Sequence, residues 1–149
     1  MFSLNLPKYE VKIERKEEKT QIWDFLRRRY VALTPEEWVR QHFIHFLTTY
    51  KEYPSSLLAN EVTLQLNGMR RRCDTVLYDR TPAPQMIIEY KAPHIPINQK
   101  VFDQISRYNL VLRVDYLIVS NGMEHYCCKM DYSQQSYQFL KEIPDYKLL

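Results

Sequence analysis

The chain has 149 residues, of which 45% are hydrophobic and 26% are charged, a balance typical of a globular protein rather than a disordered one. Its net charge of +3 is too small to identify a nucleic-acid-binding protein by itself. It contains only 2 glycines, which excludes the glycine-rich phosphate loops of P-loop ATPases and dinucleotide-binding proteins. We therefore expect one domain over residues 1–149, with no nucleotide cofactor and no ATP motor of this kind.

The cysteines indicate a reducing compartment. There are 3 of them, two are adjacent, and none forms a CxxC pair, so neither a disulfide framework nor a zinc site is expected. Residues 1–10 lack the apolar run of a signal peptide, and no segment is long and apolar enough to span a membrane. These features predict a cytoplasmic protein that does not act at a membrane.

The N-terminal part predicts a hairpin extension over about residues 1–30. Residues 8–13 alternate apolar and charged side chains, as a half-buried strand does, and residues 21–25 are the expected partner strand. The charged segment 15–19 would connect the two. A basic run at 27–29 follows, for which a solvated surface is the simplest interpretation.

A helix is predicted to begin at Thr34. Threonine caps helix N-termini, Pro35 suits the first helical position, and Glu37 would complete a capping box. The helix is expected to end before Pro54. Its buried stripe follows from apolar residues at helical spacing, namely Val39, Phe43, Phe46, Leu47 and Tyr50.

The rest of the chain predicts strands and one more helix. Asn67-Gly68 is a hairpin turn signal, and Val101 to Leu112 has helical spacing. A helix, three strands, a helix and further strands predict a mixed α/β sandwich with a helix on each side of a central sheet. The predicted strands are residues 61–66, 73–78, 86–90, 116–119, 124–130 and 137–140.

One group of residues suggests chemistry. Asp74 begins the second of these strands, and Glu89 and Lys91 lie two apart at the end of the third, so they project from the same face. Two carboxylates can hold Mg²⁺, with the backbone carbonyl of Tyr90 as a third ligand, and a lysine can orient the attacking water in phosphodiester hydrolysis. A plain salt-bridge cluster of structural purpose is the alternative interpretation.

Four blocks of sequence in this order resemble the PD-(D/E)xK nuclease superfamily, and within it the N-terminal nuclease domain of type I restriction enzyme R subunits. They are Thr-Pro-Glu-Glu-Trp-Val-Arg-Gln at 34–41, Arg-Arg-Cys-Asp at 71–74, Ile-Ile-Glu-Tyr-Lys-Ala-Pro at 87–93, and Gln-Ile-Ser-Arg-Tyr at 104–108. Cys73 departs from the proline that often precedes the motif aspartate. The resemblance implies a restriction-endonuclease-like αβββαβ core and a Mg²⁺-dependent DNA endonuclease, with Mn²⁺ as a possible substitute. It does not extend to a helicase motor.

Two helices carry further candidates. The spacing of Glu36 to the apolar stripe, together with the resemblance, makes it a third metal-ligand candidate, although the helix dipole explains a first-turn acid equally well. The resemblance also implies that Gln104 faces the active site as a catalytic residue and that Tyr108 faces DNA or the core. A polar helix face is the alternative for both.

Three arginines precede the motif aspartate. Arg70, Arg71 and Arg72 are expected to bring positive charge to DNA phosphates. Glu61 is expected to pair with Arg72, and His94 to lie in an exposed loop. The predicted partners are DNA and either a second copy of the chain or separate motor and specificity subunits. A catalytically silent module of the same fold, which binds nucleic acid or docks a subunit, is the alternative function.

Overall fold

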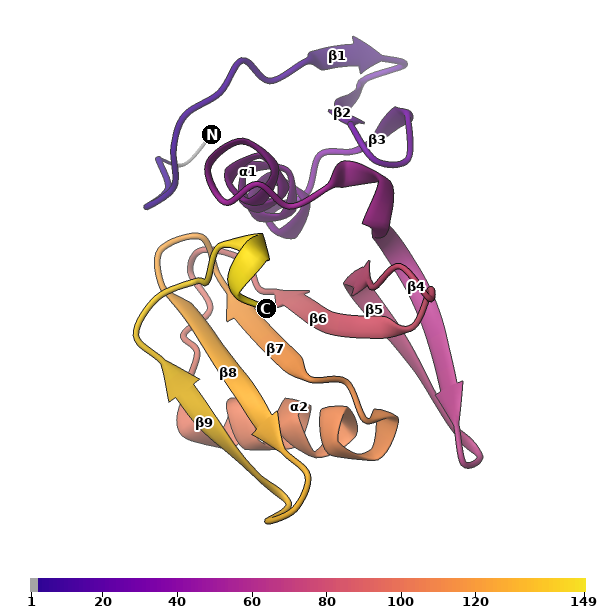
Figure 1. Cartoon of the computed structure of the whole chain (residues 1–149). Helices are drawn as coiled ribbons and strands as arrows, with labels where there is room; N and C mark the ends of the chain where they lie inside the picture. Colours follow the sequence, from indigo (N-terminus) through magenta and orange to yellow (C-terminus); the bar gives the residue numbers. More distant parts are fainter. Residues whose placement is uncertain (1–2) are drawn as a thin grey trace.

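The large sheet contains every strand that follows the first helix. The computed structural model describes residues 3–149, so residues 1 and 2 of the predicted extension lie outside it. The strand order is β4-β5-β6-β7-β8-β9, in which only β6 and β7 run parallel (Figure 1). This confirms the predicted mixed central sheet. The strands are β4 (Leu58–Leu66), β5 (Met69–Tyr78), β6 (Pro84–Tyr90), β7 (Tyr116–Ser120), β8 (His125–Asp131) and β9 (Ser136–Leu140).

Helix α1 (Pro35–Tyr50) covers one face of this sheet. As predicted, Thr34 caps it, because the Thr34 Oγ1 atom accepts the backbone N–H of Glu37 at 3.0 Å. Phe43 and Leu47 are fully buried, whereas Tyr50 is exposed, so its place in the predicted buried stripe was wrong. The helix packs on a cluster that includes Met86, Ile88 and Ile118 of the sheet.

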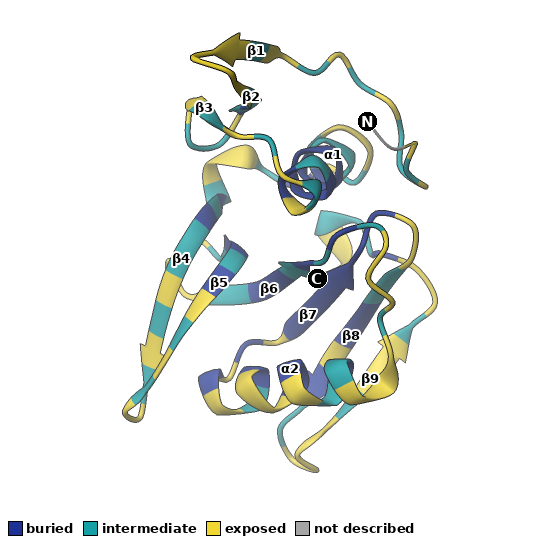
Figure 2. Cartoon of the chain, turned by 180° about the vertical axis from the view of Figure 1, so that it is seen from behind, coloured by how far each residue is buried: buried dark blue, intermediate teal, exposed yellow. Residues whose placement is uncertain are grey.

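Helix α2 (Gln99–Leu112) covers the other face (Figure 2). Its N-cap is Asn98, whose side chain accepts the backbone N–H of Val101 at 2.9 Å. The helix connects the parallel strands β6 and β7, a pairing that always needs a crossover. With one helix on each face, the predicted order αβββαβ is confirmed, followed by the two extra strands β8 and β9.

Strand β5 begins earlier than predicted, at Met69 rather than at Cys73. It follows a two-residue turn in which Asn67 and Gly68 have φ angles of 50° and 78°, as a type I′ hairpin requires. Arginines 70–72 therefore lie within the strand, and alternation directs Arg71 to one face of the hairpin and its two neighbours to the other.

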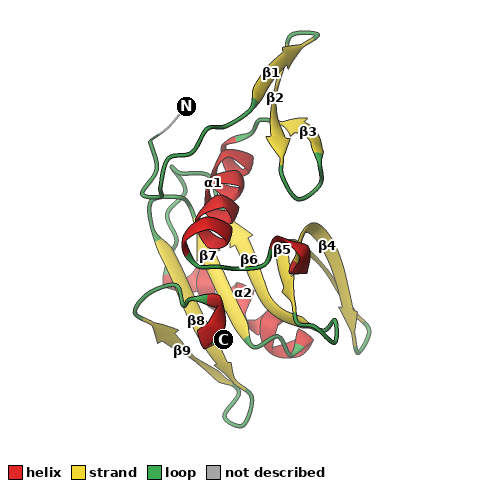
Figure 3. Ribbon diagram, turned by 45° about the horizontal axis from the view of Figure 1, so that its top comes forward, coloured by secondary structure: helices red, strands yellow, loops and turns green. Residues whose placement is uncertain are grey.

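The N-terminal extension is a three-stranded antiparallel sheet of β1 (Ile13–Lys16), β2 (Lys19–Asp24) and β3 (Arg29–Ala32). The predicted strand at 8–13 is wrong, because this segment runs along α1, where the Tyr9 ring stacks on His45 at 4.4 Å. The prediction also missed β3. Figure 3 shows α1 lying between this small sheet and the large one.

Short 3₁₀ turns at Ser55–Leu57 and Tyr146–Leu148 complete the chain. None of the helices within residues 3–149 combines the length and hydrophobicity of a membrane-spanning segment. Cys73, Cys127 and Cys128 are free thiols and all three are buried.

Candidate active site at the splayed end of strands β5 and β6

The β5–β6 ladder opens at the site. Backbone pairing reaches Thr75 and Ile88, and beyond them the backbone N–H of Tyr90 donates to the Asp74 Oδ2 atom at 2.9 Å. The N–H and C=O of one strand residue point to the same side, so the Tyr90 carbonyl faces this gap as well. The Lys91 N–H points the other way and donates to the Ser120 carbonyl on β7 at 2.8 Å.

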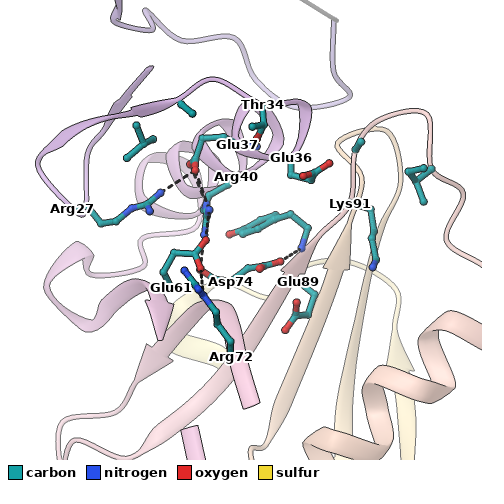
Figure 4. Close-up of a pocket in the computed structure, with 15 residues that line it drawn as sticks. Arg27, Thr34, Glu36, Glu37, Arg40, Glu61, Arg72, Asp74, Glu89 and Lys91 are labelled. Atoms are coloured by element: carbon teal, nitrogen blue, oxygen red, sulfur yellow. Dashed lines mark hydrogen bonds and ion pairs between the residues drawn. The ribbon is translucent and has the colours of Figure 1, made fainter. Parts of the chain in front are cut away.

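This opening is the floor of a cavity of about 740 Å³ below α1 (Figure 4). Asp74, Glu89 and Lys91 all line it, so the structure brings together the three residues on which the sequence interpretation depends. Tyr90 and Glu36 line it too. Asp74 and Glu89 come from neighbouring strands, and Lys91 follows the last residue of β6.

The two carboxylates affect each other. Burial and the neighbouring Asp74 carboxylate raise the pKa of Glu89 to about 8, although Arg71 and Lys91 act in the opposite direction. A carboxylate with so high a pKa is poorly stabilised as an anion by the residues around it. A cation placed between Asp74 and Glu89 would relieve this repulsion.

Arg71 contacts Glu89 directly. Its Nη2 atom lies 2.6 Å from the Glu89 Oε1 atom, and only 13% and 12% of the two side chains are exposed. The sequence predicted a DNA-contacting role for all three arginines. In the structure Arg70 is exposed and Arg72 is paired with Glu61 at 2.7 Å, which confirms the predicted pair.

The wall formed by α1 differs from its prediction. The Glu37 carboxylate does not close a capping box. It accepts hydrogen bonds from Arg27 at 2.9 Å, from Arg40 at 2.9 and 3.0 Å and from Gln41 at 2.8 Å. Glu37 is buried, and a buried carboxylate is stable only where several donors surround it.

Glu36 does not lie on the buried stripe, because its side chain is exposed. It extends toward the strand end that carries Lys91, across the cavity from the floor (Figure 4). The inward position that the spacing assigned to Glu36 belongs to Glu37 instead.

Arg40 is a site residue that the sequence interpretation missed. Its Nη1 atom donates to the backbone carbonyl of Asp74 at 2.7 Å, and its Nη2 atom donates to the Glu61 Oε1 atom at 2.7 Å. Arginine and glutamate three apart on a helix, as in Glu37 and Arg40, were the available signal. The partners of Arg40 and Glu37 on other elements could not be predicted from the sequence around the helix.

A buried polar chain behind the floor was also missed. The Tyr90 hydroxyl donates to Thr75 Oγ1 at 3.0 Å, Thr75 donates to Asn60 Oδ1 at 2.7 Å, and Asn60 Nδ2 donates to Asp24 Oδ2 at 3.0 Å. Asp24 also binds Arg27. The N-terminal sheet is thereby connected to the strand that carries Glu89.

Gln104 does not line the cavity, so the structure does not bring it to the site. It is exposed on α2 and lines a separate groove of about 370 Å³ together with Tyr108. The helix packs through Phe102 and Ile105, which directs the intervening Gln104 outward. His94 is exposed, as expected.

The donors that fit a metal ion are few. Among residues 3–149, no three or more His, Cys, Asp or Glu side chains are arranged to hold one, so Glu36 does not form a three-acid group with Asp74 and Glu89. Two carboxylates and the Tyr90 carbonyl are nevertheless hard oxygen donors, the kind that Mg²⁺ prefers while keeping several waters. The donor chemistry therefore fits Mg²⁺ or Mn²⁺ and not a softer metal.

Comparison with known proteins gives a family and a fold. Residues 35–144 match the family described as type I restriction enzyme R protein N terminus. A search of curated proteins finds no match. Among solved structures, the chain is similar to a fragment assigned as the HsdR subunit of a type I restriction enzyme from Vibrio vulnificus YJ016, with a TM-score of 0.51 and 22% identity.

This likeness covers 76% of the chain but 24% of the solved one, so the chain spans about a quarter of that structure's length. At this identity it shows the fold alone. The family match extends over well more than half of the chain and supports a restriction-endonuclease-like role. The chain belongs to the family of type I restriction enzyme R protein N termini.

Proposed function

We propose that the chain is a Mg²⁺-dependent nuclease domain that hydrolyses phosphodiester bonds of DNA. The observation that carries this proposal is the convergence of Asp74, Glu89 and Lys91 in one cavity, at the point where β5 and β6 separate. The family supports the same chemistry.

Each of these residues has a distinct role in the proposal. Asp74 and Glu89 would hold the metal ion with the Tyr90 carbonyl, and the bound ion would supply positive charge and a water of lowered pKa. The Tyr90 N–H orients the Asp74 carboxylate, and Arg40 fixes the Asp74 backbone. The Lys91 ammonium would orient the attacking water and stabilise charge that develops on the phosphate.

DNA is the proposed substrate, and it would approach through exposed arginines. Arg70 and Arg72 are exposed on the strand that carries Asp74, where they would neutralise phosphates. The similar solved structure is that of a fragment assigned as an HsdR subunit of a type I restriction enzyme. We therefore propose motor and specificity subunits, or a second copy of the chain, as partners, and the cytoplasm as the place of action.

The decisive experiment replaces single site residues in the full chain. Asp74→Asn keeps an oxygen that can accept the Tyr90 N–H, and Lys91→Met keeps the length of the side chain. We expect each to slow the nicking of supercoiled plasmid with Mg²⁺ by about a hundredfold or more. Glu142→Gln and Lys141→Met, at exposed positions outside the cavity, are the matched controls. Cleavage by Asp74→Asn at the wild-type rate would show the assignment to be wrong.

Metal binding is measured separately by thermal denaturation. Wild-type protein should gain stability as Mg²⁺ or Mn²⁺ is added, because an ion that binds only the folded state shifts unfolding by mass action. Asp74→Asn should lose most of this gain. An equal gain in both proteins would contradict the proposed ligands.

The silent module is the second candidate, and the Arg71–Glu89 ion pair favours it, since this contact occupies one metal ligand. The silent-module hypothesis predicts salt-sensitive DNA binding without cleavage. A binding assay at two salt concentrations beside the plasmid assay distinguishes the two functions, and a purely structural ion cluster would show neither activity.

A further inference from the structure

The Arg71 guanidinium lies among groups that leave it incompletely paired. Its Nη2 atom binds Glu89 at 2.6 Å, and its guanidinium carbon lies 5.1 Å from the centre of the Tyr108 ring. Its Nη1 atom is buried and has no hydrogen-bond partner among residues 3–149. One end of the group is therefore held, and the other has donors with no acceptor.

This arrangement is costly for a residue that serves stability alone. An unpaired buried donor loses the free energy of its hydrogen bond to water without compensation. The Arg71 side chain is 13% exposed, so solvent does not restore what is missing. An acceptor that joins the site during function would complete the group.

The position of Arg71 indicates what this acceptor is. Its partner Glu89 lines the cavity, while Tyr108 lines the neighbouring groove together with Lys100 and Arg107. Arg71 therefore lies between the candidate metal ligands and a surface with two further cations. A guanidinium fork matches the geometry of a phosphate, and the Tyr108 ring beside it attracts the cation.

We propose that Arg71 is the hydrogen-bond partner of Glu89 in the metal-free protein and a phosphate-binding residue for DNA once Glu89 turns to a divalent cation. This inference rests on the proposed nuclease function. In the free protein the Arg71 Nη2 atom donates to the Glu89 carboxyl group at 2.6 Å. In the loaded protein the guanidinium is released by Glu89, turns outward and presents its donors to the phosphate backbone of the bound strand.

The test separates metal binding from cleavage. Mn²⁺ is titrated by calorimetry into DNA-free wild type, Arg71→Met and Arg71→Lys. Single-turnover cleavage of a duplex oligonucleotide is then measured at saturating Mg²⁺. Arg80→Met, at an exposed position in the turn between β5 and β6, is the matched control.

Loss of the competing positive charge should lower the Kd of Arg71→Met for Mn²⁺ by about tenfold. Loss of the phosphate donors should slow its cleavage by about a hundredfold. Arg71→Lys keeps the charge but not the fork, so its Kd should stay near wild type while cleavage slows by about tenfold. Tighter metal binding together with slower cleavage is not expected of a residue that only supports the fold.

Weaker Mn²⁺ binding by Arg71→Met, or cleavage as fast as wild type, overturns the inference and leaves the nuclease function in place. If Arg71→Met does not fold, Arg71→Lys decides, and an unchanged cleavage rate overturns the inference. Wild-type protein that neither binds Mn²⁺ nor cleaves DNA would instead remove the nuclease function, and this inference with it.

Discussion

Arg40 donates a hydrogen bond from Nη1 to the backbone carbonyl of Asp74, at 2.7 Å. The same guanidinium binds Glu37 of its own helix and Glu61 of β4. Helix α1 is thereby fixed to the sheet at the residue whose carboxylate lines the cavity, so the charge network and the geometry of the site depend on each other.

We expect Arg40→Met to lower the free energy of unfolding by about 3 kcal/mol, because the buried Glu37 and the partly buried Glu61 would both lose a charged donor. Urea denaturation measures this loss. Arg72→Met is the matched control, since the Arg72 side chain is 72% exposed in its own pair with Glu61. That change should cost less than about 1 kcal/mol. Equal losses would show that burial of the network does not determine its contribution.

Tyr90→Phe should remove one link of the buried polar chain. The Tyr90 hydroxyl donates to Thr75 Oγ1 at 3.0 Å, and both residues are buried. We expect a loss of about 1 kcal/mol in the free energy of unfolding. Tyr50→Phe, on an exposed side chain of α1, is the control and should change stability little. A neutral Tyr90→Phe would mean that the chain adds nothing to stability.

The buried histidines should make the protein less stable as the pH drops below about 6.5, whereas Glu89, whose pKa burial raises to about 8, contributes stability that grows as the pH falls over the same range. Burial lowers the pKa of both His42 and His125. Between the folded and the unfolded pKa of each group, the unfolded chain therefore binds more protons than the folded chain. The contribution of the two neutral histidines to the free energy of unfolding is complete above their pKa in the unfolded chain. It declines as the pH falls toward their pKa in the folded chain. Asp24 and Glu61, whose pKa values donors lower despite burial, lose their contribution only in more acidic solution.

Urea denaturation at pH 7.5, 6.0 and 5.0 checks this prediction. His125 Nδ1 lies 2.7 Å from Ser120 Oγ and its Nε2 lies 2.9 Å from the Asn5 carbonyl, so His125→Gln removes the titrating group while keeping a polar side chain. The variant should lose less stability than wild type between pH 6.5 and 5. An identical pH dependence would exclude His125 as a cause.

Gly122→Ala should destabilise the protein more than Gly68→Ala. Both glycines have positive φ angles, of 85° and 78°, which cost an alanine about 1 kcal/mol in either place. A Cβ atom at Gly122 would also lie 2.7 Å from Leu4 Cδ2, whereas one at Gly68 would have nothing within 4 Å. The difference between the two losses in a thermal melt measures the contact, and equal losses would show that Leu4 moves aside freely.

Local signals were sufficient for much of the fold. Thr34-Pro35 marked the start of α1 and Asn67-Gly68 marked the hairpin, because caps and tight turns depend on a few adjacent residues. The period of two along a strand placed Glu89 and Lys91 together. These features can be predicted without knowing which residues pack against them.

The errors concern residues whose environment comes from distant parts of the chain. Glu36 was preferred to Glu37 because its spacing to the apolar stripe and the family resemblance both favoured it, while Glu37 was assigned to a capping box. The helix is in fact covered on a second side by the small sheet, which supplies Arg27 to Glu37. Because that sheet was only partly predicted, its effect on the buried face of α1 could not be predicted.

The same reasoning applies to α2 and Gln104. The role that the family resemblance implied for Gln104 required its face of α2 to lie against the cavity. The actual rotation of α2 is set by Phe102, Ile105 and Leu112 against the sheet, and it turns Gln104 to the separate groove. Periodicity shows that a helix has an inner face but not which part of the sheet that face meets.

The small N-terminal sheet decides where a shortened fragment can begin. The family match starts at residue 35, but Arg27, Val31 and Ala32 form part of the cavity wall, and Asp24 completes the chain to Tyr90. A fragment cloned from residue 35 would leave Asn60 without its carboxylate and Glu37 without Arg27. The smallest piece worth expressing therefore starts ahead of β1, well before the region that sequence similarity outlines.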